Sequence, residues 1–482
     1  MKKHTKIVAT ISDKRCEVDF LTKLYQEGLN VVRMNSAHLD SAGFDKIIAN
    51  VRTVSNQIAL LMDTKGPEVR TTVCRDTICF KEGERVKIVG DPGKETTHEC
   101  IALTYPDFVA DVKMHAHVLI DDGELDFRVV ERHDDYLLCE AQNTAELGSR
   151  KSVNVPGMPI KLPSLTERDK TNILYAIEKD IDFIAHSFVR SKQDVLDIQA
   201  ILDAHNSPIK IIAKIENQEG VDNIDEILEV AYGIMVARGD LGIEVPQQKI
   251  PGIQRKLIKK CILAKKPVIV ATQMLHTMIE HPRPTRAEVT DIANAIYYRT
   301  DALMLSGETA YGKYPIEALR TMAQIAEQAE KDKLEENDIR IPLGEPDVTA
   351  FLAKQAVKAS QKMHTRAIFT DSYTGRTARY VAAFRGKHPV LAFCYNEKTM
   401  RLLALSYGVT PIYLPEKGNA RNYFYAALKM LLDSKRVTKE DMFAYLSGSF
   451  GAGGGTTFLE INKVGTVLDN EKEYLLPTFV TR

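Results

Sequence analysis

Short apolar runs alternate with longer amphipathic stretches through the first two-thirds of the chain. Each run is rich in Val, Ile and Leu and ends in a polar residue or a glycine, and a stretch with helical spacing follows it. Near-continuous apolar strands that alternate with helices are typical of a parallel sheet buried on both faces. The eight runs are Lys6–Ile11, Leu29–Asn35, Ile58–Asp63, Asp182–Phe188, Ile209–Glu216, Gly233–Arg238, Pro267–Gln273 and Ala302–Glu308.

Helices are expected between these strands. Eight strand–helix units favour closure into a (β/α)8 TIM barrel over residues 1–67 and 155–342, with a doubly wound open sheet as the alternative. The stretch Ser164-Leu165-Thr166-Glu167 has the S-x-x-E spacing of a capping box at a helix start. The expected helices are Ser41–Val54, Glu167–Glu178, Asp194–His205, Asp222–Val230, Gln247–Lys265, Thr285–Tyr298 and Pro315–Ala329.

Residues 68–154 interrupt this pattern between the third and fourth strands. Short β-like runs alternate here with turn signals such as Glu82-Gly83 and Asp122-Gly123. The pattern predicts a small β-barrel inserted in a βα loop at the active-site end, where it could swing as a lid. The runs are Thr77–Phe80, Arg85–Val89, His117–Ile120, Asp126–Val130 and Tyr136–Glu140.

A third pattern occupies residues 343–482 and predicts a smaller open-sheet α/β domain. The loop that contains Thr374, Gly375, Arg376 and Thr377 lies between a strand and a helix, where backbone N–H groups and hydroxyls can bind an anion. Glycine and threonine are equally common there for turn and capping reasons alone. The glycine-rich stretch Gly448–Gly455 is interpreted as a loop. The expected elements are helices Asp347–Met363 and Ala378–Arg385 and strands Arg366–Thr370, Pro389–Cys394, Thr410–Leu414, Met442–Leu446 and Thr456–Val464.

Charge and composition narrow the function classes. The 64 Lys and Arg residues balance 65 Asp and Glu residues among 482, so no net charge favours a nucleic-acid or membrane partner. No apolar run approaches the ~20 residues of a membrane helix or forms the core of a signal peptide, which predicts a cytoplasmic protein. Seven scattered cysteines, none in a CxxC pair, predict free thiols rather than a disulfide framework.

Polar residues stand at the ends of six of the predicted barrel strands. Strand C-termini meet at the catalytic mouth of a β/α barrel, so these side chains are expected to converge there. Lys214 and Glu216, two residues apart, leave the same face of their strand, either as a structural ion pair or as a functional pair. Glu216 and Asp240 supply hard oxygen ligands suited to Mg²⁺. The six strand ends contribute Arg33 and Asn35, Asp63, Lys214 and Glu216, Gly239 and Asp240, Thr272, and Ser306.

These residues indicate a chemistry of charge rather than of covalent catalysis. Arg33, Arg70 and Lys214 offer positive charge for phosphate or carboxylate groups, although Arg70 could equally be a solvated hinge residue. No His is paired with a Ser or Cys by a local motif. Positioning and electrostatic stabilisation are the means by which phosphoryl transfer is catalysed.

Eight motifs, in order along nearly the whole chain, resemble the pyruvate kinase family. That resemblance implies the reaction phosphoenolpyruvate + ADP + H⁺ → pyruvate + ATP, the final step of glycolysis. The motifs are TKIVATI at Thr5–Ile11, GLNVVRMN at Gly28–Asn35, MDTKGPEVR at Met62–Arg70, AKIENQEG at Ala213–Gly220, GIMVARGDLGIE at Gly233–Glu244, VATQM at Val270–Met274, PRPTRAE at Pro282–Glu288 and MLSGET at Met304–Thr309.

The resemblance also implies roles at the barrel mouth. Glu216 and Asp240 would hold Mg²⁺ (or Mn²⁺). Lys214 would stabilise charge on the moving phosphoryl group and the enolate, and Arg33 would contact the phosphoryl group. Gly239 and Thr272 would hold the substrate, with Thr272 and Ser306 near the route of the proton to the enol carbon.

Other implied sites concern K⁺, the nucleotide, effectors and assembly. K⁺ would be held by Asn35, Asp63 and Thr64, and Glu68 occupies the acidic position of potassium-dependent members. Asn35, His38, Arg70 and Lys151 are the candidates for nucleotide contact. The loop Thr374–Thr377 corresponds to a sugar-phosphate effector loop. Pro282–Glu288 either simply starts the seventh barrel helix, with Pro284 near its first position, or lies where the family has a subunit interface, which implies a homotetramer.

The chain departs from the family pattern in four places. Ser12-Asp13 replaces a Gly-Pro near the nucleotide base, which puts the nucleotide preference in question. Ala37 replaces a serine expected to bind K⁺, so water or a neighbouring serine would have to substitute. Thr374–Thr377 matches the effector loop only in part, and Gly448–Gly455 is richer in glycine than the family's facing loop, so the effector's identity does not carry over.

Two other functions remain open at this point. One is a Mg²⁺-dependent barrel aldolase acting on pyruvate or oxaloacetate, against which the β insertion and the Lys214/Thr272 pair argue. The other is a regulatory binding protein with weakened catalysis, supported only by Ser12-Asp13 and Ala37. Neither an N-terminal helical extension nor an appended phosphotransferase-like domain is expected.

Overall fold

Eight parallel strands form a closed barrel, as the alternation of apolar runs predicts. The computed structural model describes residues 3–158, 161–333, 339, 341, 347–415, 420–448 and 455–469. The strands follow the order β1-β17-β16-β15-β14-β13-β3-β2 around the barrel. Their bounds are β1 Lys6–Thr10, β2 Val31–Asn35, β3 Ala59–Asp63, β13 Phe183–His186, β14 Lys210–Ile215, β15 Gly233–Ala237, β16 Val268–Ala271 and β17 Ala302–Leu305.

The barrel has an inner and an outer apolar layer because side chains alternate along each strand. On β14, Ile212 belongs to the inner cluster, whereas Ile211 and Ala213 pack outward against the helices. The inner cluster extends to Leu402 and Leu405 of the C-terminal part, which therefore packs against the floor of the barrel. The floor is consequently filled with side chains and only the mouth carries the polar residues.

The helices around the barrel lie where they were expected, with one local correction. The helix that begins at Glu167 is capped by Thr166 and Asp169, not by Ser164 and Glu167. Ser164 instead donates a hydrogen bond to Asp197. The bounds are α1 Val18–Gln26, α2 Ser41–Val54, α4 Glu167–Glu178, α5 Lys192–Ala204, α6 Gln218–Asp222, α7 Ile224–Val230, α8 Arg238–Glu244, η1 Gln247–Lys249, α9 Ile250–Ala264, η2 His276–Ile279, α10 Arg286–Tyr297, α11 Gly307–Ala310 and α12 Pro315–Asp332.

The insertion after β3 forms its own β structure with a separate core. A seven-stranded sheet of order β4-β12-β8-β9-β10-β6-β7 stands beside a two-stranded sheet of β11 and β5. An isolated bridge between Thr71 and Leu103 joins the two edges of the larger sheet, so it curls towards a barrel. Its elements are β4 Val69–Arg70, β5 Ile78–Phe80, β6 Arg85–Val89, β7 Cys100–Ala102, α3 Phe108–Asp111, β8 His117–Ile120, β9 Leu125–Arg132, β10 Leu137–Ala141, β11 Ala145–Leu147 and β12 Ser152–Asn154.

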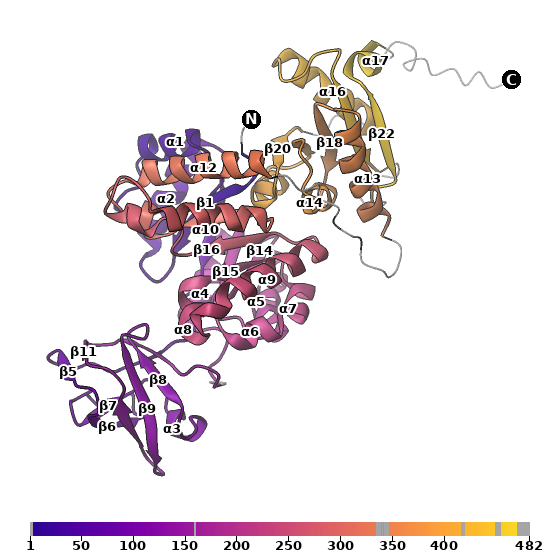
Figure 1. Cartoon of the computed structure of the whole chain (residues 1–482). Helices are drawn as coiled ribbons and strands as arrows, with labels where there is room; N and C mark the ends of the chain where they lie inside the picture. Colours follow the sequence, from indigo (N-terminus) through magenta and orange to yellow (C-terminus); the bar gives the residue numbers. More distant parts are fainter. Residues whose placement is uncertain are drawn as a thin grey trace.

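The C-terminal part is a five-stranded sheet flanked by helices. Its order is β20-β19-β18-β21-β22, with only β22 antiparallel to its neighbour. Figure 1 places it at the end of the barrel away from the inserted β sheets. Most of the predicted Gly448–Gly455 loop lies outside the described residues. The elements are α13 Val348–Lys362, β18 Ala367–Ser372, α14 Arg376–Ala383, β19 Val390–Cys394, α15 Glu397–Leu402, η3 Leu403–Leu405, β20 Val409–Tyr413, α16 Ala420–Asp433, β21 Met442–Ser447, β22 Phe458–Lys463 and α17 Val464–Asp469.

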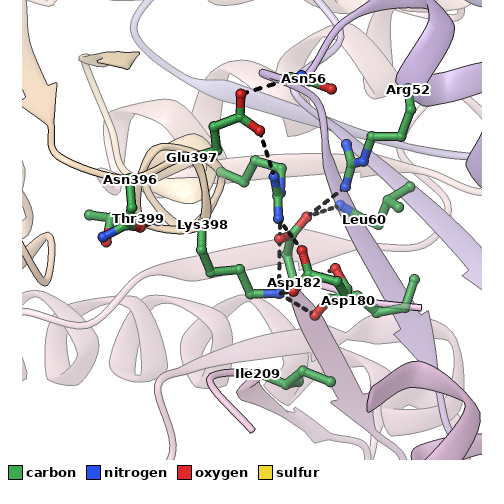
Figure 2. A network of polar contacts seen from close by, with 12 residues as sticks. Arg52, Asn56, Leu60, Asp180, Asp182, Ile209, Asn396, Glu397, Lys398 and Thr399 are labelled. Atoms are coloured by element: carbon green, nitrogen blue, oxygen red, sulfur yellow. Dashed lines mark hydrogen bonds and ion pairs between the residues drawn. The ribbon is translucent and has the colours of Figure 1, made fainter. Parts of the chain in front are cut away.

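A buried ionic network fastens the C-terminal part to the barrel floor. Arg401 of α15 bonds to Asp182 (2.8 Å) and Asp180 (2.6 Å), which precede β13. Lys398 of the same helix reaches Asp180 at 2.8 Å and Asp182 at 3.2 Å, and Arg52 approaches Asp182 from α2 (Figure 2). Because Asp182 is fully buried, these cations offset the cost of removing its charge from water.

All seven cysteines are free thiols, and only Cys79 among them is exposed. Among the described helices, none has the length and apolar character needed to cross a membrane.

Candidate active site at the barrel mouth

The candidate residues at the mouth continue the inward-facing rows of the strands. On β14, Ile212 faces the barrel interior, so Lys214 and Glu216 face the same way two and four residues later. Arg33 likewise follows the inward Val31 on β2, and Asp63 follows Leu61 on β3. The side chains meet because each row ends at the same rim.

Four of these residues form one ionic cluster. The Lys214 ammonium lies 2.9 Å from Glu216 Oε1 and 3.5 Å from Asp63 Oδ2. Asp63 Oδ2 also pairs with the Arg33 guanidinium. Because Asp63 forms ion pairs with both Arg33 and Lys214, it holds both side chains against strand β3 before any ligand binds.

Burial and neighbouring charge together shift the pKa values in this cluster. Burial alone would lower the pKa of Lys214, but Glu216 and Asp63 outweigh it and raise the pKa, which keeps the ammonium charged. Burial would raise the pKa of Asp63, but Arg33 and Lys214 hold it below its usual range. Burial raises the pKa of Glu216, Lys214 opposes that shift, and the negative charge of Asp240 adds to it.

Glu216 and Asp240 fit a divalent cation. Asp240 lies close enough to influence the pKa values of Glu216 and Lys214, and its own carboxylate makes no hydrogen bond or ion pair within the described part of the chain. Glu216 Oε2 accepts a hydrogen bond from the Phe188 N–H at 2.7 Å, while Oε1 is buried with only Lys214 beside it. No group of three or more His, Cys, Asp or Glu that could hold a metal occurs among the described residues, so substrate and water oxygens would complete the coordination.

The ends of β15, β16 and β17 bring together Gly239, Thr272 and Ser306. The Gly239 N–H donates to Thr272 Oγ1 at 2.7 Å, and that hydroxyl donates to the Ala271 carbonyl at 2.7 Å. Thr272 has a left-handed backbone with φ of 67°, which is costly for a β-branched residue and aims the side chain out of the strand pattern. The Ser306 hydroxyl is buried without a hydrogen-bond partner among the described residues.

Oxygen atoms suited to a monovalent cation lie next to the ionic cluster. Asp63 Oδ1 and the Ser36 hydroxyl are buried and have no hydrogen-bond partner within the described ranges. Asn35 Oδ1 accepts a hydrogen bond from the Ala37 N–H at 3.1 Å. The Thr64 carbonyl accepts a hydrogen bond from the Ser187 hydroxyl at 2.7 Å. Two oxygens without partners are consistent with a cation, because buried polar atoms are nearly always satisfied.

A cleft of about 750 Å³ separates the inserted β structure from the barrel mouth. Arg70 and Lys151 line it from the insertion and Asp240 from the barrel, whereas His38 is exposed and is not among its lining residues. Arg70 pairs with Glu68 at 2.7 Å, and Lys151 pairs with Asp121 at 2.7 Å. The cleft therefore brings together only part of the candidate nucleotide set.

Sequence reasoning overlooked several residues that position this site. Ser187, just after β13, accepts a hydrogen bond from the Lys214 ammonium at 2.9 Å, and Thr10 at the end of β1 accepts one from Arg33 at 3.0 Å. The buried Glu308 accepts hydrogen bonds from the Ser306 N–H at 2.7 Å and the Leu275 N–H at 3.3 Å. The rule that polar residues gather at strand ends, applied to all eight strands, would have identified Ser187 and Thr10.

The candidate effector loop lies far from the mouth, between β18 and α14. The Ser372 hydroxyl accepts a hydrogen bond from the Gly375 N–H at 3.0 Å, and Gly375 has φ of 77°. The Thr377 hydroxyl lies 2.8 Å from that of Thr456. Arg376 and Thr374 are exposed at the start of the helix.

The fold and the mouth define a class: a barrel enzyme that transfers phosphoryl groups by positioned charge and a metal. Comparison with known proteins specifies the family. Residues 2–319 match the family model described as pyruvate kinase, barrel domain, and residues 351–462 match that described as pyruvate kinase, alpha/beta domain.

Two relatives and one solved structure agree with this assignment. The chain is 47% identical over 472 residues to a pyruvate kinase of Borreliella burgdorferi, covering 96% of this chain and 98% of the relative. It is 41% identical to one of Geobacillus stearothermophilus, covering 97% of this chain and 81% of the relative. A crystal structure of a pyruvate kinase from Cryptosporidium parvum superimposes with a TM-score of 0.89 at 33% identity over 96% of each chain. The chain belongs to the pyruvate kinase family, a family of metal-dependent phosphotransferases that act on phosphoenolpyruvate and ADP.

Proposed function

We propose that Lys214 and Arg33 are the cations that act on the transferred phosphoryl group. In the reaction, the bond between phosphorus and the enol oxygen breaks while an oxygen of the ADP β-phosphate bonds to phosphorus. Charge moves onto the enolate oxygen as this happens, and a lysine fixed by Glu216 and Asp63 can stabilise it without reorganisation. Arg33, fixed by Asp63 and Thr10, orients the phosphoryl oxygens.

Glu216 and Asp240 would hold Mg²⁺, or Mn²⁺ in its place. An ion held by these two carboxylates would supply Lewis-acid stabilisation of negative charge on the substrate. Asn35, Asp63 and Thr64 would hold K⁺. Asp63 Oδ1 and the Ser36 hydroxyl, which lack hydrogen-bond partners in the described part of the chain, support a cation there. The hydroxyl of Ser36 is then the neighbouring group that substitutes for the one lost at Ala37.

Gly239 and Thr272 would bind the substrate, and Thr272 and Ser306 would serve the proton route. The enolate carbon must gain one proton to give pyruvate. The hydroxyl of Ser306, which has no partner among the residues that the structure describes, can hold a water or donate, and the hydrogen bonds of Thr272 hold its hydroxyl at the mouth.

The nucleotide would occupy the cleft beneath the insertion. Arg70 and Lys151 offer positive charge to its phosphates. Asn35 and His38, which do not line this cleft, remain candidates from the family resemblance alone. Residues 68–154 would act as a lid over the barrel at residues 1–67 and 155–342. The Asn154 side chain of the insertion donates a hydrogen bond to Glu244 of the barrel at 3.0 Å. Movement of the lid would break and re-form this contact.

Regulation and assembly complete the proposal. Residues 343–482 would form the regulatory domain, with Thr374, Gly375, Arg376 and Thr377 contacting a sugar phosphate. A homotetramer is supported by the largely exposed stretch at Pro282–Glu288 and by Tyr297, which is 42% exposed on α10. Sedimentation velocity of the purified chain tests the assembly, and a monomer at all concentrations would contradict it.

The observation that carries the proposal is the ionic cluster of Arg33, Asp63, Lys214 and Glu216. The experiment is pyruvate formation from phosphoenolpyruvate, ADP and Mg²⁺, with and without K⁺ in one titration. Turnover stimulated by K⁺ is expected. Turnover without any effect of K⁺ would remove the assignment of Asn35, Asp63 and Thr64, and no turnover under either condition would remove the catalytic assignments.

A further inference from the structure

A second cleft, of about 600 Å³, lies at the floor of the barrel against the C-terminal domain. Its barrel side comes from the starts of β14, β15 and β16, and its other side comes from α14 and α15. Two tyrosines, Tyr232 and Tyr380, also line it. Six cationic side chains line the cleft, and no Asp or Glu does so among the described residues: Lys210, Lys265, Lys266, Arg376, Arg379 and Lys398.

Four of the six cations have no carboxylate partner in the described part of the chain. Within the described ranges, Lys210 makes no ion pair, and Lys266 donates only to the backbone carbonyls of Glu229 and Ala231, at 3.2 and 2.6 Å. Arg379 donates to the Thr374 carbonyl at 3.1 Å and lies over the Tyr232 ring at 4.9 Å. Arg376 lies over the Tyr380 ring at 5.2 Å.

The positive charge of these four side chains is not neutralised by the nearest described acids, because those acids are engaged by other residues. Lys398 is engaged by Asp180 and Asp182 in the junction network (Figure 2), and Lys265 lies 3.8 Å from Asp347. Among the acids outside the cleft, Glu229 pairs with Lys192 at 2.6 Å, and Asp203 accepts a hydrogen bond from Gln199.

The pKa values of two lysines respond to this crowding. Burial lowers the pKa of Lys210, and Arg379 and Lys398 lower it further, with Asp203 opposing. Burial also lowers the pKa of Lys266, with Arg379 adding to it. Like charges held together in a partly buried site raise the energy of the empty cleft, and an anion would relieve that cost.

We propose that this floor cleft, lined by Lys210, Lys266 and Arg379, binds the phosphate group of a small organic phosphomonoester. Lysine ammonium groups act as point charges for phosphate oxygens, and Arg379 can add a bidentate contact. The volume suits a nucleoside monophosphate or a sugar monophosphate, for which the phosphate is the shared chemistry. Tyr232 and Tyr380 provide apolar walls for the organic part.

This site is distinct from the candidate effector site on the Ser372–Thr377 turn. The hydroxyls of Ser372 and Thr377 lie in the C-terminal domain and contact Gly375 and Thr456, whereas the cleft draws half of its cations from the barrel. Only Thr374 and Arg376 belong to both. A ligand at the floor would therefore contact two domains, whereas a ligand of the hydroxyls would contact one.

Three strands connect the floor cleft to the mouth. β14 begins at Lys210 and carries Lys214, with Glu216 directly after it; all three lie on one face of the strand. β15 follows Tyr232 and leads to Asp240, and β16 follows Lys266 and leads to Thr272. A ligand that holds the floor against α14 and α15 is thus placed to influence all three strand ends.

The test is binding measured by titration calorimetry on the full-length protein without substrates. The probes are adenosine 5′-monophosphate and fructose 6-phosphate, with adenosine and fructose as uncharged counterparts. At least one phosphate ester is expected to bind, and its counterpart not to. Lys210→Gln should weaken that binding at least about tenfold, the range for losing a charge-assisted contact. Lys439→Gln removes the same charge from an exposed position of the C-terminal domain and should leave the Kd unchanged.

The outcomes separate this site from the effector loop and from catalysis. Arg379→Gln, which alters a cleft residue outside the Thr374–Thr377 loop, serves as a second variant if Lys210→Gln is poorly folded. Binding of neither ester overturns the proposal. So does an unchanged Kd in Lys210→Gln together with loss of binding in Thr377→Ala, which would assign the ligand to the effector hydroxyls. Because no turnover is involved, the result does not depend on the catalytic roles proposed above.

Discussion

Positive side chains gather at both ends of strand β14, but they have different partners at the two ends. At the mouth, Lys214 lies within 3.5 Å of two carboxylates, and Arg33 shares one of them. At the floor, Lys210 has no ion pair with any described residue, and its cationic neighbours Lys266 and Arg379 contact carbonyls and a ring. On the roles proposed above, the mouth would take a ligand that brings both a metal and anions, and the floor would take an anion alone.

The difference also concerns rigidity. A cation held by carboxylates is oriented before the substrate arrives, which favours transition-state stabilisation. A cation without such partners gains most from the ligand itself, which favours binding-dependent ordering of the two domains that meet there. The largest effects of mutation should therefore appear at the mouth and in turnover.

Replacing Lys214 by Met should have the largest effect. We expect kcat to fall on the order of 10³-fold with a smaller change in KM, because the ammonium charge matters most when negative charge develops on the enolate. Steady-state kinetics with varied phosphoenolpyruvate measure this. Lys439→Met, which removes an exposed lysine of the C-terminal domain, is the control. A kcat close to that of the parent would exclude Lys214 from the mechanism.

Removing a metal carboxylate should come next. Glu216→Gln keeps the shape but loses the charge, so we expect Mn²⁺ affinity to fall on the order of 100-fold. Electron paramagnetic resonance of free Mn²⁺ measures the affinity without any turnover. Glu317→Gln, on the exposed face of α12, should bind Mn²⁺ like the parent protein. An equally unaffected Glu216→Gln would show that the ion is held elsewhere.

The junction at the floor gives a third, smaller effect on stability. Arg401→Met leaves the buried Asp182 with Lys398 and Arg52 as its remaining cations. We expect a loss of about 2 kcal/mol, less than for a buried charge left with no partner at all. Chemical denaturation followed by circular dichroism measures it.

A matched variant separates burial from the loss of an arginine. Arg320→Met breaks an exposed pair with Glu27 and should change stability little. If both variants lost the same free energy of unfolding, the network in Figure 2 would contribute no more to stability than an exposed ion pair.

The fold could be predicted from the sequence because its signal is repeated. Eight near-continuous apolar runs that alternate with helical stretches identified the barrel, and helix starts such as that of α2 agreed to the residue. The prediction of a capping box at Ser164 was wrong. Two S/T-x-x-D/E patterns overlap there, one starting at Ser164 and one at Thr166, and only the structure shows that Thr166 has the extended backbone of an N-cap.

The site was predictable where chemistry follows the strand ends, and not where it depends on contact between distant segments. Lys214 and Glu216 could be paired from their spacing alone. Ser187 could have been found from its place at the end of β13, but the hydrogen bond from the Leu275 N–H to Glu308 joins residues 33 positions apart, which no local pattern encodes. The floor cleft was missed for the same reason, since Lys210 and Arg379 belong to different domains and meet only after folding.

The smallest expected effect concerns the monovalent cation. Ala37→Ser restores a hydroxyl next to Asn35, whose side-chain oxygen already accepts a hydrogen bond from the N–H of residue 37. We expect the K⁺ concentration for half-maximal stabilisation against heat to fall a few-fold, in keeping with one added ligand worth about 1 kcal/mol. Thermal unfolding in K⁺ and in a bulky organic cation measures this without turnover.

Ser36→Ala makes the same comparison in the opposite direction. The Ser36 hydroxyl is fully buried and has no partner among the described residues, so a role as the substitute ligand predicts weaker stabilisation by K⁺ when it is removed. If Ser36→Ala leaves the K⁺ dependence unchanged while Ala37→Ser strengthens it, water rather than Ser36 completes the site. If neither variant alters the response to K⁺, the cation does not bind beside Asn35, and the contrast between mouth and floor would rest on the divalent metal alone.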